Sequence, residues 1–412
     1  MRTHIFGLSN IMVTKTYRMN MWERWRFIFT KGRETLYRIE PSEGLFGRLS
    51  NRLPSVDSNA FPQTSFKWFA KVPRCQWLVA CASVLLVGLP DVLHAGQGLR
   101  RTQAIPLSKG WNAVFLEVEP DDTSPAKVFS GLPVDKAATL VENPTTNQFV
   151  SDSAIDLSKS GGWGIWYSAE LPESFLKSLD AIHGNQAYLV HAKEGCVWQA
   201  VGSATQTIVK WRSDAYNLVG FPVRTPGGPT FGQFFAGSPA HVGQKIYRLV
   251  NGRWKQVLQP TTQAMKSGEA FWIFCEGRSE YQGPLRVEAP SRLGLLLGRG
   301  GNEIILRNNC PHPLNPTVEH VPGASPAVPL SVIVRTFGDP ADPTSTASVP
   351  MPAAAWSQTL PPLESGDGFA IPFECRAAEM VRPEQASLLK ITTDLGTETW
   401  VPVRGFRDDL ED

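Results

Sequence analysis

The sequence predicts a mainly β protein in which two tandem β-rich repeat units with short helices precede a β-sandwich domain. Three observations lead to this prediction. A stretch at 110–118 returns in altered form at 215–223. Apolar extended runs rich in β-branched and aromatic residues are separated by turn residues, as in sheets packed on a core. The 35 Gly and 33 Pro among 412 residues also favour short strands and many turns over long helices.

The repeat is clearest where each unit opens. Gly-Trp-Asn-Ala-Val-Phe-Leu-Glu-Val at 110–118 aligns with Ala-Tyr-Asn-Leu-Val-Gly-Phe-Pro-Val at 215–223, and further matches follow downstream. Large aromatic side chains at strand starts are usually buried. We therefore expect the shared positions to be structural anchors: Trp111, Asn112 and Tyr188 in the first unit, and Tyr216, Asn217 and Phe271 in the second.

Each unit reads as a strand, a helical turn, a hairpin and a closing strand. In the first unit Ser124 can cap the helix, Pro125 sits where a missing N–H costs nothing, and Gly131 ends the helix. Thr230 and Gly237 take the cap and end positions in the second unit. Because the same helix start and stop residues occur in both units, the prediction of a short helix in each unit rests on two independent signals.

The opening Lys-Gly-Trp-Asn-Ala-Val-Phe-Leu at 109–116, with Gly-Asn-Gln-Ala-Tyr-Leu-Val at 184–190, resembles the Gly-Trp-Asn-type β-repeats of large bacterial exported and cell-surface proteins. The resemblance covers roughly residues 105–289. It implies surface or extracellular placement and brings no catalytic residues with it. The second copy departs from the pattern, because Ala215 and Tyr216 replace Gly-Trp.

The N-terminal quarter differs from the rest of the chain in charge. Residues 1–74 hold 13 Lys and Arg against 5 Asp and Glu, whereas residues 96–412 hold 27 against 32. The apolar run at 77–89, preceded by basic residues and followed by Ala95, is typical of a secretory signal, so we expect a signal peptide at 72–95. A buried core helix is the alternative. Residues 1–71 form a basic extension, explained either by a start assigned upstream of the true one or by disorder.

The exported part is expected to contain three domains. They are a first repeat unit at 96–205 with an aromatic insertion, a second at 206–289, and an immunoglobulin-like or fibronectin-like sandwich at 290–412. In the sandwich the strand-like runs are short and separated by turns, and the Pro-rich segments 321–329 and 339–354 read as loops. The predicted strands are 293–297, 303–307, 330–336, 368–373, 387–391 and 398–403.

The exported part has four cysteines, and export permits disulfides. Cys196 and Cys275 each follow the closing strand of their unit, and Cys310 and Cys375 lie in the third domain, so pairing within regions is one prediction. The alternative is that all four are free and buried. The histidines lack zinc-like spacing, and the sequence holds no phosphate-binding loop, nucleophile elbow or calcium loop. We expect no metal and no cofactor.

The aromatic insertion is the candidate ligand site. Trp163, Trp166 and Tyr167 lie in a Gly-rich stretch that reads as a loop absent from the second unit. Aromatic faces on loops can stack on sugar rings, so these three side chains are a hypothetical carbohydrate platform. The alternative is that they form another core strand.

The sequence contains no constellation that demands catalysis. Glu117 and Glu119 lie at i, i+2 on one strand face, and such residues are usually only solvated. The mildly acidic body excludes nucleic acid as a partner. We therefore expect a non-catalytic structural or adhesive protein outside the cytoplasm that contacts the membrane only through its export signal. Cell-surface polysaccharide or surface proteins are the expected partners, a carbohydrate-binding module is the alternative, and a hydrolase is a further one.

Overall fold

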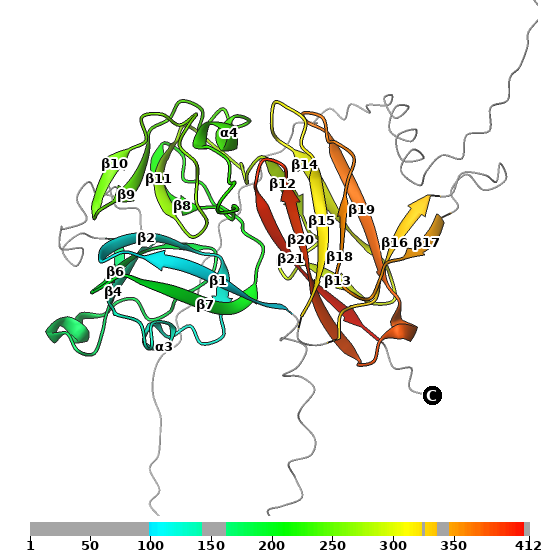
Figure 1. Cartoon of the computed structure of the whole chain (residues 1–412), viewed down its shortest axis with the longest axis horizontal. Helices are drawn as coiled ribbons and strands as arrows, with labels where there is room; N and C mark the ends of the chain where they lie inside the picture. The colour runs from blue at the N-terminus through cyan, green and yellow to red at the C-terminus, as the bar shows by residue number, and fades with distance from the viewer. Residues whose placement is uncertain (1–98, 142–161, 324–325, 336–345, 408–412) are drawn as a thin grey trace, which may run out of the picture. The chain divides into compact units, whose positions relative to one another are not determined.

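The computed structural model describes residues 99–141, 162–323, 326–335 and 346–407. All of them belong to one unit of the chain, Leu86–Asp412. The predicted signal peptide at 72–95, the extension at 1–71 and part of the predicted insertion lie outside the described residues. Within the described ranges, no helix has the length and apolar character to cross a membrane. The described part is mainly β, as predicted, and is built from five sheets (Figure 1).

The two repeat units contain sheets of identical topology. In the first, the strand order is β2-β6-β4-β5, and in the second it is β8-β11-β9-β10, with every pairing antiparallel. In both, the opening strand pairs with the closing strand, which pairs with the second strand, which pairs with the third. The strands are β2 (Gly110–Leu116), β4 (Val134–Leu140), β5 (Trp163–Tyr167), β6 (Gln186–Ala192), β8 (Ala215–Gly220), β9 (Ile246–Val250), β10 (Arg253–Gln256) and β11 (Ala270–Cys275).

The shared asparagine explains why the motif opens each unit. The Asn112 side chain accepts a hydrogen bond from Ser108 N at 2.8 Å and donates to Ser108 O at 2.8 Å and Gly110 O at 2.9 Å. Asn217 makes the same three bonds, to Arg212 N at 2.9 Å, Arg212 O at 3.1 Å and Ala215 O at 3.0 Å. Each asparagine therefore closes the turn that leads into its strand.

The turn itself differs by one residue between the copies. Gly110 adopts a φ of 93° in the first, and Asp214 adopts a φ of 54° in the second. Positive φ values favour glycine and are tolerated by aspartate. The second copy can therefore carry Ala215 where the first has Gly110, because the left-handed residue has moved one place toward the N-terminus.

Both units contain the predicted short helix. Helix α4 (Phe231–Phe235) has a capping box in which the Thr230 hydroxyl accepts from Gln233 N and the Gln233 side chain accepts from Thr230 N. Helix α3 (Pro125–Val128) begins with the predicted Pro125, but the Ser124 side chain makes no capping bond. Gly237 does not end α4 by a positive φ. Its role is steric, because a Cβ there would lie 1.6 Å from Asn309 O.

A second, smaller sheet covers the first repeat. It consists of β1 (Arg100–Leu107), β7 (Cys196–Ala204) and β3 (Val118–Pro120), in the order β1-β7-β3. The second repeat has no such ladder among the described residues. Side chains replace it: Val209 N donates to Gln282 Oε1 at 2.7 Å, and Trp211 Nε1 donates to Tyr281 O at 2.6 Å. The two copies therefore differ in this layer, which is a strand ladder in the first and side-chain hydrogen bonds in the second.

The four-stranded sheets of the two repeats pack on each other through the same face. Trp163, Leu189 and Trp272 lie in one buried cluster, with Trp111, Tyr216 and Trp254 packed against it. The ring centroids of Trp163 and Trp272 are 6.4 Å apart and nearly perpendicular. The opposite face of each sheet covers a separate core, which contains Tyr188 in the first repeat and Phe271 in the second. The repeats therefore share an interface between equivalent surfaces.

The C-terminal region is a β-sandwich of two five-stranded sheets. All pairings are antiparallel except that β13 pairs in parallel with β21. One sheet has the order β12 (Leu285–Glu288), β14 (Asn302–Asn308), β19 (Gly368–Cys375), β16 (Leu330–Arg335) and β17 (Thr346–Pro350). The other has the order β13 (Leu295–Leu297), β21 (Glu398–Phe406), β20 (Glu384–Thr393), β15 (Pro316–Pro322) and β18 (Trp356–Thr359).

The sandwich differs from the sequence prediction in two respects. Strand β12 pairs with β14, so the sandwich takes in residues that the predicted boundary at 290 left in the second repeat. Strand β17 lies inside the segment 339–354 that was predicted to be a loop. Two 3-10 helices complete the described elements, η3 (Pro172–Leu176) and η4 (Ala377–Glu379).

Candidate ligand-binding cleft

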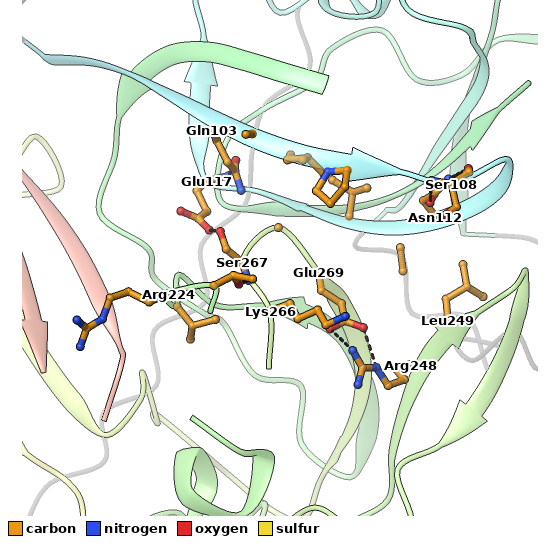
Figure 2. A pocket seen from close by; sticks show the side chains of 18 of the residues that line it. Gln103, Ser108, Asn112, Glu117, Arg224, Arg248, Leu249, Lys266, Ser267 and Glu269 are labelled. Carbon is orange, nitrogen blue, oxygen red and sulfur yellow. Dashed lines mark hydrogen bonds and ion pairs between the residues drawn. The ribbon is translucent and has the colours of Figure 1, made fainter. Parts of the chain in front are cut away.

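A cleft of about 1120 Å³ lies where the two repeats meet the sandwich. The first repeat contributes β1 and the start of β2, and the second contributes the turn after β9 and the segment 266–269. Glu398 and Trp400 of β21 complete the lining. Figure 2 shows the labelled side chains, with Glu117 and Ser267 close to each other and the Arg248–Glu269 pair further along. The cleft therefore draws on all three modules.

The innermost charged group of the cleft is Glu117, which is 2% exposed. Its Oε2 lies 2.7 Å from Nη2 of Arg101, and its Oε1 accepts a hydrogen bond of 3.2 Å from the Ser267 hydroxyl. Burial raises the pKa of the Glu117 carboxyl above its ordinary value, although the ion pair with Arg101 opposes that rise. The Arg101 guanidinium also lies 5.1 Å from the centroid of the Trp400 ring. These contacts join the first repeat to the second repeat and to the sandwich.

The prediction that Glu117 is merely solvated is wrong. It lies between β2 and β3, and both of its neighbours, Leu116 and Val118, are buried as well. The alternation of buried and exposed side chains therefore fails at Glu117, because the chain passes here from the sheet that contains β2 to the sheet that contains β3. Arg101 and Glu117 are only 16 residues apart, but β1 and β2 belong to different sheets, so strand pairing gave no signal for their contact. Glu119, by contrast, is half-buried and accepts a 2.7 Å hydrogen bond from Gly184 N.

A second ion pair lies along the same cleft. Arg248 donates from Nε to Glu269 Oε1 at 2.8 Å and from Nη2 to Oε2 at 2.7 Å, a bidentate geometry. Burial raises the pKa of the Glu269 carboxyl, against the opposing effects of Arg248 and Lys266. Both carboxylates that burial perturbs are thus held by an arginine, which keeps their oxygens occupied by hydrogen-bond donors.

The rim of the cleft is basic. Lys109, Arg224 and Lys266 are exposed and line the cleft. Among the described residues, none of the three forms an ion pair; the Arg224 side chain donates to the Thr393 carbonyl, and Arg224 N donates to Gly396 O at 2.9 Å. The cleft therefore presents positive charge to solvent while its carboxylates are engaged further in.

A smaller cleft of about 600 Å³ occupies the equivalent position on the other side of the repeat interface. It is lined by residues 139–141, 184–187, 208–210 and 216–220, with Phe115 and Arg212. Strand register makes Thr139 equivalent to Arg248 and Gln186 equivalent to Glu269. Here the pair is neutral, because Gln186 Nε2 donates to Thr139 Oγ1 at 2.9 Å. At this pair of positions the two clefts therefore differ in charge although their backbones correspond.

The aromatic residues proposed as a carbohydrate platform do not lie in a loop. Trp163, Trp166 and Tyr167 form strand β5, which is the counterpart of β10, and each is at most 8% exposed. Trp163 and Tyr167 face the repeat interface, and Trp166 faces the core of the first repeat. The interpretation as a loop absent from the second unit is wrong, and the alternative of a further core strand is confirmed, because β4 pairs with this stretch and holds it extended.

The anchor residues divide into two groups. Tyr188 and Phe271 are fully buried, whereas Trp111 and Tyr216 are half-buried at the edge of the repeat interface.

The described cysteines Cys196, Cys275, Cys310 and Cys375 are all free thiols, so no disulfide joins them. Burial raises the pKa of Cys310 and of Cys375 to about 11, which keeps both thiols protonated at neutral pH.

The buried histidines are paired with serines rather than grouped as metal ligands. His241 Nδ1 lies 2.6 Å from Ser238 Oγ, and His320 Nε2 lies 2.8 Å from Ser387 Oγ. Burial lowers the pKa of His241 to about 4, and it lowers that of His320 as well. In the part of the chain that the structure describes, no three His, Cys, Asp or Glu side chains are grouped so that they could hold a metal ion.

Comparisons with known proteins add little to this description. No protein-family model matches the chain, and no curated protein matches it. Among solved structures, the chain is similar to one from the X-ray structure of the entire lipid-containing bacteriophage PM2. The identity is 11%, the match covers 75% of this chain and 88% of that chain, and the TM-score is 0.13. A TM-score of this size supports no inference about fold or function.

Proposed function

We propose that this protein is a non-catalytic, exported structural or adhesive protein whose β-modules display a binding surface outside the cytoplasm. The observation that carries the proposal is the state of the cleft carboxylates. Glu117 and Glu269 are each bound by an arginine at 2.7 Å. A general acid or base needs a proton-transfer position open to substrate, and an ion pair of this kind occupies that position.

The other nucleophilic or basic groups support the same conclusion. The four described thiols have pKa values raised by burial, which disfavours the reactive thiolate. His241 lies among Trp211, Phe235 and Tyr281 and is 2% exposed, so its Ser238 partner belongs to the core. The groups that remain at the cleft surface are basic and polar, and these suit binding.

The proposal of export rests on the apolar run at 77–89 with its basic flank and on the resemblance of 105–289 to exported β-repeats. It is tested by fractionating cells that express the full chain and sequencing the N-terminus of the recovered protein. We expect the protein outside the cytoplasm with its N-terminus close to residue 96. Recovery of residues 1–95 on cytoplasmic protein would contradict export.

The non-catalytic role is tested with the full chain and isolated cell-envelope material. We expect saturable retention of the protein on this material, with the sizes of its polysaccharides and proteins unchanged after long incubation. Glu117→Gln, which keeps the shape of the side chain, should retain the same material. Shortening of any component that disappears with Glu117→Gln or Glu269→Gln would make the protein a hydrolase and overturn the proposal.

A further inference from the structure

The charged lining of the larger cleft is not required by the repeat fold. The equivalent position in the other copy is filled by Thr139 and Gln186, whose neutral hydrogen bond of 2.9 Å joins the same two strands. The Arg248 and Glu269 side chains are 18% and 16% exposed, and removing two charges from water even in part is costly, so a neutral pair often serves stability as well. The charges at Arg248 and Glu269 therefore call for an explanation outside folding, and the surface that they border is the cleft.

The charge of the cleft favours an acidic ligand. Three carboxylates line it, and two of them are held by arginines within the lining itself. The third, Glu398, is 3.2 Å from Lys390. The five basic lining residues thus include three with no carboxylate partner among the described residues: Lys109, Arg224 and Lys266. Exposed charges of one sign around a concave surface attract ligands of the opposite sign and set their orientation.

One wall of the cleft is the unpaired edge of a strand. Residues 101–106 of β1 all line the cleft. In the described part of the chain, β1 pairs with β7 and with no other strand. Pro106 fits this position, because proline in a sheet is confined to edges. An unpaired edge offers backbone N–H and C=O groups to an added strand, which is a recurrent way of binding extended peptides.

The aromatic side chains of the cleft are poorly placed to stack on sugars. Trp400 has the Arg101 guanidinium 5.1 Å and the Lys390 ammonium 5.3 Å from its ring centroid. Trp111 makes an edge contact with His191, with ring centroids 5.2 Å apart. Sugar recognition relies on aromatic faces that are open to the ligand, so the backbone edge and the cationic rim are the stronger recognition elements here.

We propose that this cleft binds an extended acidic polypeptide segment, added as a strand along the β1 edge with its carboxylates toward Lys109, Arg224 and Lys266. The inference rests on the proposed non-catalytic role and names its partner. Main-chain hydrogen bonds to residues 101–105 supply the alignment, and the basic rim selects for acidic side chains. The cleft exceeds the ~300–1000 Å³ typical of small-molecule sites, in keeping with a polymeric ligand.

The test measures fluorescence anisotropy of a labelled peptide of about twelve residues that alternates Glu and Thr, added to the full chain. We expect saturable binding that weakens as the salt concentration rises from about 50 to about 300 mM. Two further probes separate the recognition elements. A peptide of the same sequence with alternate amides N-methylated retains the charge but loses strand pairing, and a polyuronate of equal charge retains the charge without a peptide backbone.

Two matched double variants place the site. Lys109→Glu with Lys266→Glu reverses two rim charges, and we expect it to weaken peptide binding about tenfold or more. Lys245→Glu with Lys255→Glu makes the same charge change at exposed positions outside the cleft and should alter binding by less than about twofold. All four positions are exposed, so circular dichroism should show folded protein in both cases.

Each outcome decides the proposal. Binding lost with the rim variant and with the N-methylated peptide supports strand addition in this cleft. Equal weakening by both variants, tighter binding of the polyuronate than of the peptide, or no peptide binding by the folded protein overturns it. These results are independent of the proposed non-catalytic role, whose failure would be seen as shortening of envelope components that depends on Glu117.

Discussion

The two repeats of this chain have the same backbone plan but different surface chemistry. Both sheets connect their strands in the same spatial order, and both open with an asparagine that closes the preceding turn. At the equivalent positions beside the closing strand, however, one copy has Thr139 with Gln186 and the other has Arg248 with Glu269. The comparison teaches that the fold requires a hydrogen-bonded pair at this place and leaves its charge open to other demands.

The largest expected effect comes from the interface between the copies. Trp272 lies at the centre of this interface and is 0% exposed, and Leu189 occupies the equivalent position in the first repeat. Trp272→Ala should lower the free energy of unfolding by about 3–5 kcal/mol, because a large cavity remains between two sheets that cannot collapse on it. Urea denaturation measures this. Leu189→Ala is the matched change and should cost about 2–5 kcal/mol; a loss below about 1 kcal/mol for both would mean that the sheets do not rely on this layer.

Low pH should destabilise the protein through His241, a buried histidine of the second repeat. Burial lowers the pKa of His241 to about 4, against about 6.5 in an unfolded chain. The unfolded state therefore binds the proton first, so stability is complete above pH ~6.5 and falls as the pH drops toward ~4, by about 3 kcal/mol at most. Thermal denaturation between these pH values measures the slope.

The control for this pH effect is His241→Gln, which can still pair with Ser238 but does not titrate. The variant should have a shallower slope than the natural chain, and the slope that remains belongs in part to His320, whose pKa burial also lowers. An unchanged slope in His241→Gln would show that the histidine is not responsible.

The turn-closing asparagines should have smaller and unequal effects. Asn217 is buried and Asn112 is half-buried, although each makes the same three bonds. Asn217→Ala should cost about 1–3 kcal/mol, and Asn112→Ala about 1 kcal/mol, because water can replace the lost partner where the loop is exposed. Chemical denaturation of both variants gives the ranking, and an equal cost for both would contradict the burial argument.

The smallest effect is expected when the second copy is given the pair of the first. Arg248→Thr with Glu269→Gln should change stability by less than about 1 kcal/mol, because a neutral pair replaces a partly buried ion pair. Arg248→Thr alone leaves the partly buried Glu269 carboxylate without its partner and should cost about 1–3 kcal/mol. Unfolding curves of the two variants test this. A double variant as unstable as the single one would mean that the charges serve the fold.

The parts of the fold with strong local signals were predictable from sequence. The repeated Asn opening and the helix punctuation predict β2, β8, α3 and α4, and alternating apolar runs predict most strands of the sandwich. Strands β15, β17 and β18 were missed because they are short or carry proline at an end, and pairing with neighbours holds them extended. For strand β5 the sequence leaves a loop and a core strand both open, because glycines surround its aromatic residues, and the strand is what forms.

The cleft was beyond sequence reasoning for a different reason. Its lining comes from three modules, and the partners of Glu117 lie at Arg101 and Ser267, the latter 150 residues away along the chain. Local patterns report on residues within one element, whereas this pairing depends on how the repeats pack. Arg101 lies only 16 residues from Glu117, but β1 and β2 belong to different sheets, so a pairing of neighbouring strands did not indicate this contact either.

The face through which the repeats meet is the same face in both, which is the geometry of a two-fold dimer contained in a single chain. In a dimer of identical subunits, every substitution occurs twice and alters both equivalent clefts together. A chain that carries both halves has no such constraint. One cleft can keep the neutral pair of Thr139 and Gln186, while its twin acquires a charged pair at the same place and a larger volume, so a symmetric framework can hold two different surfaces.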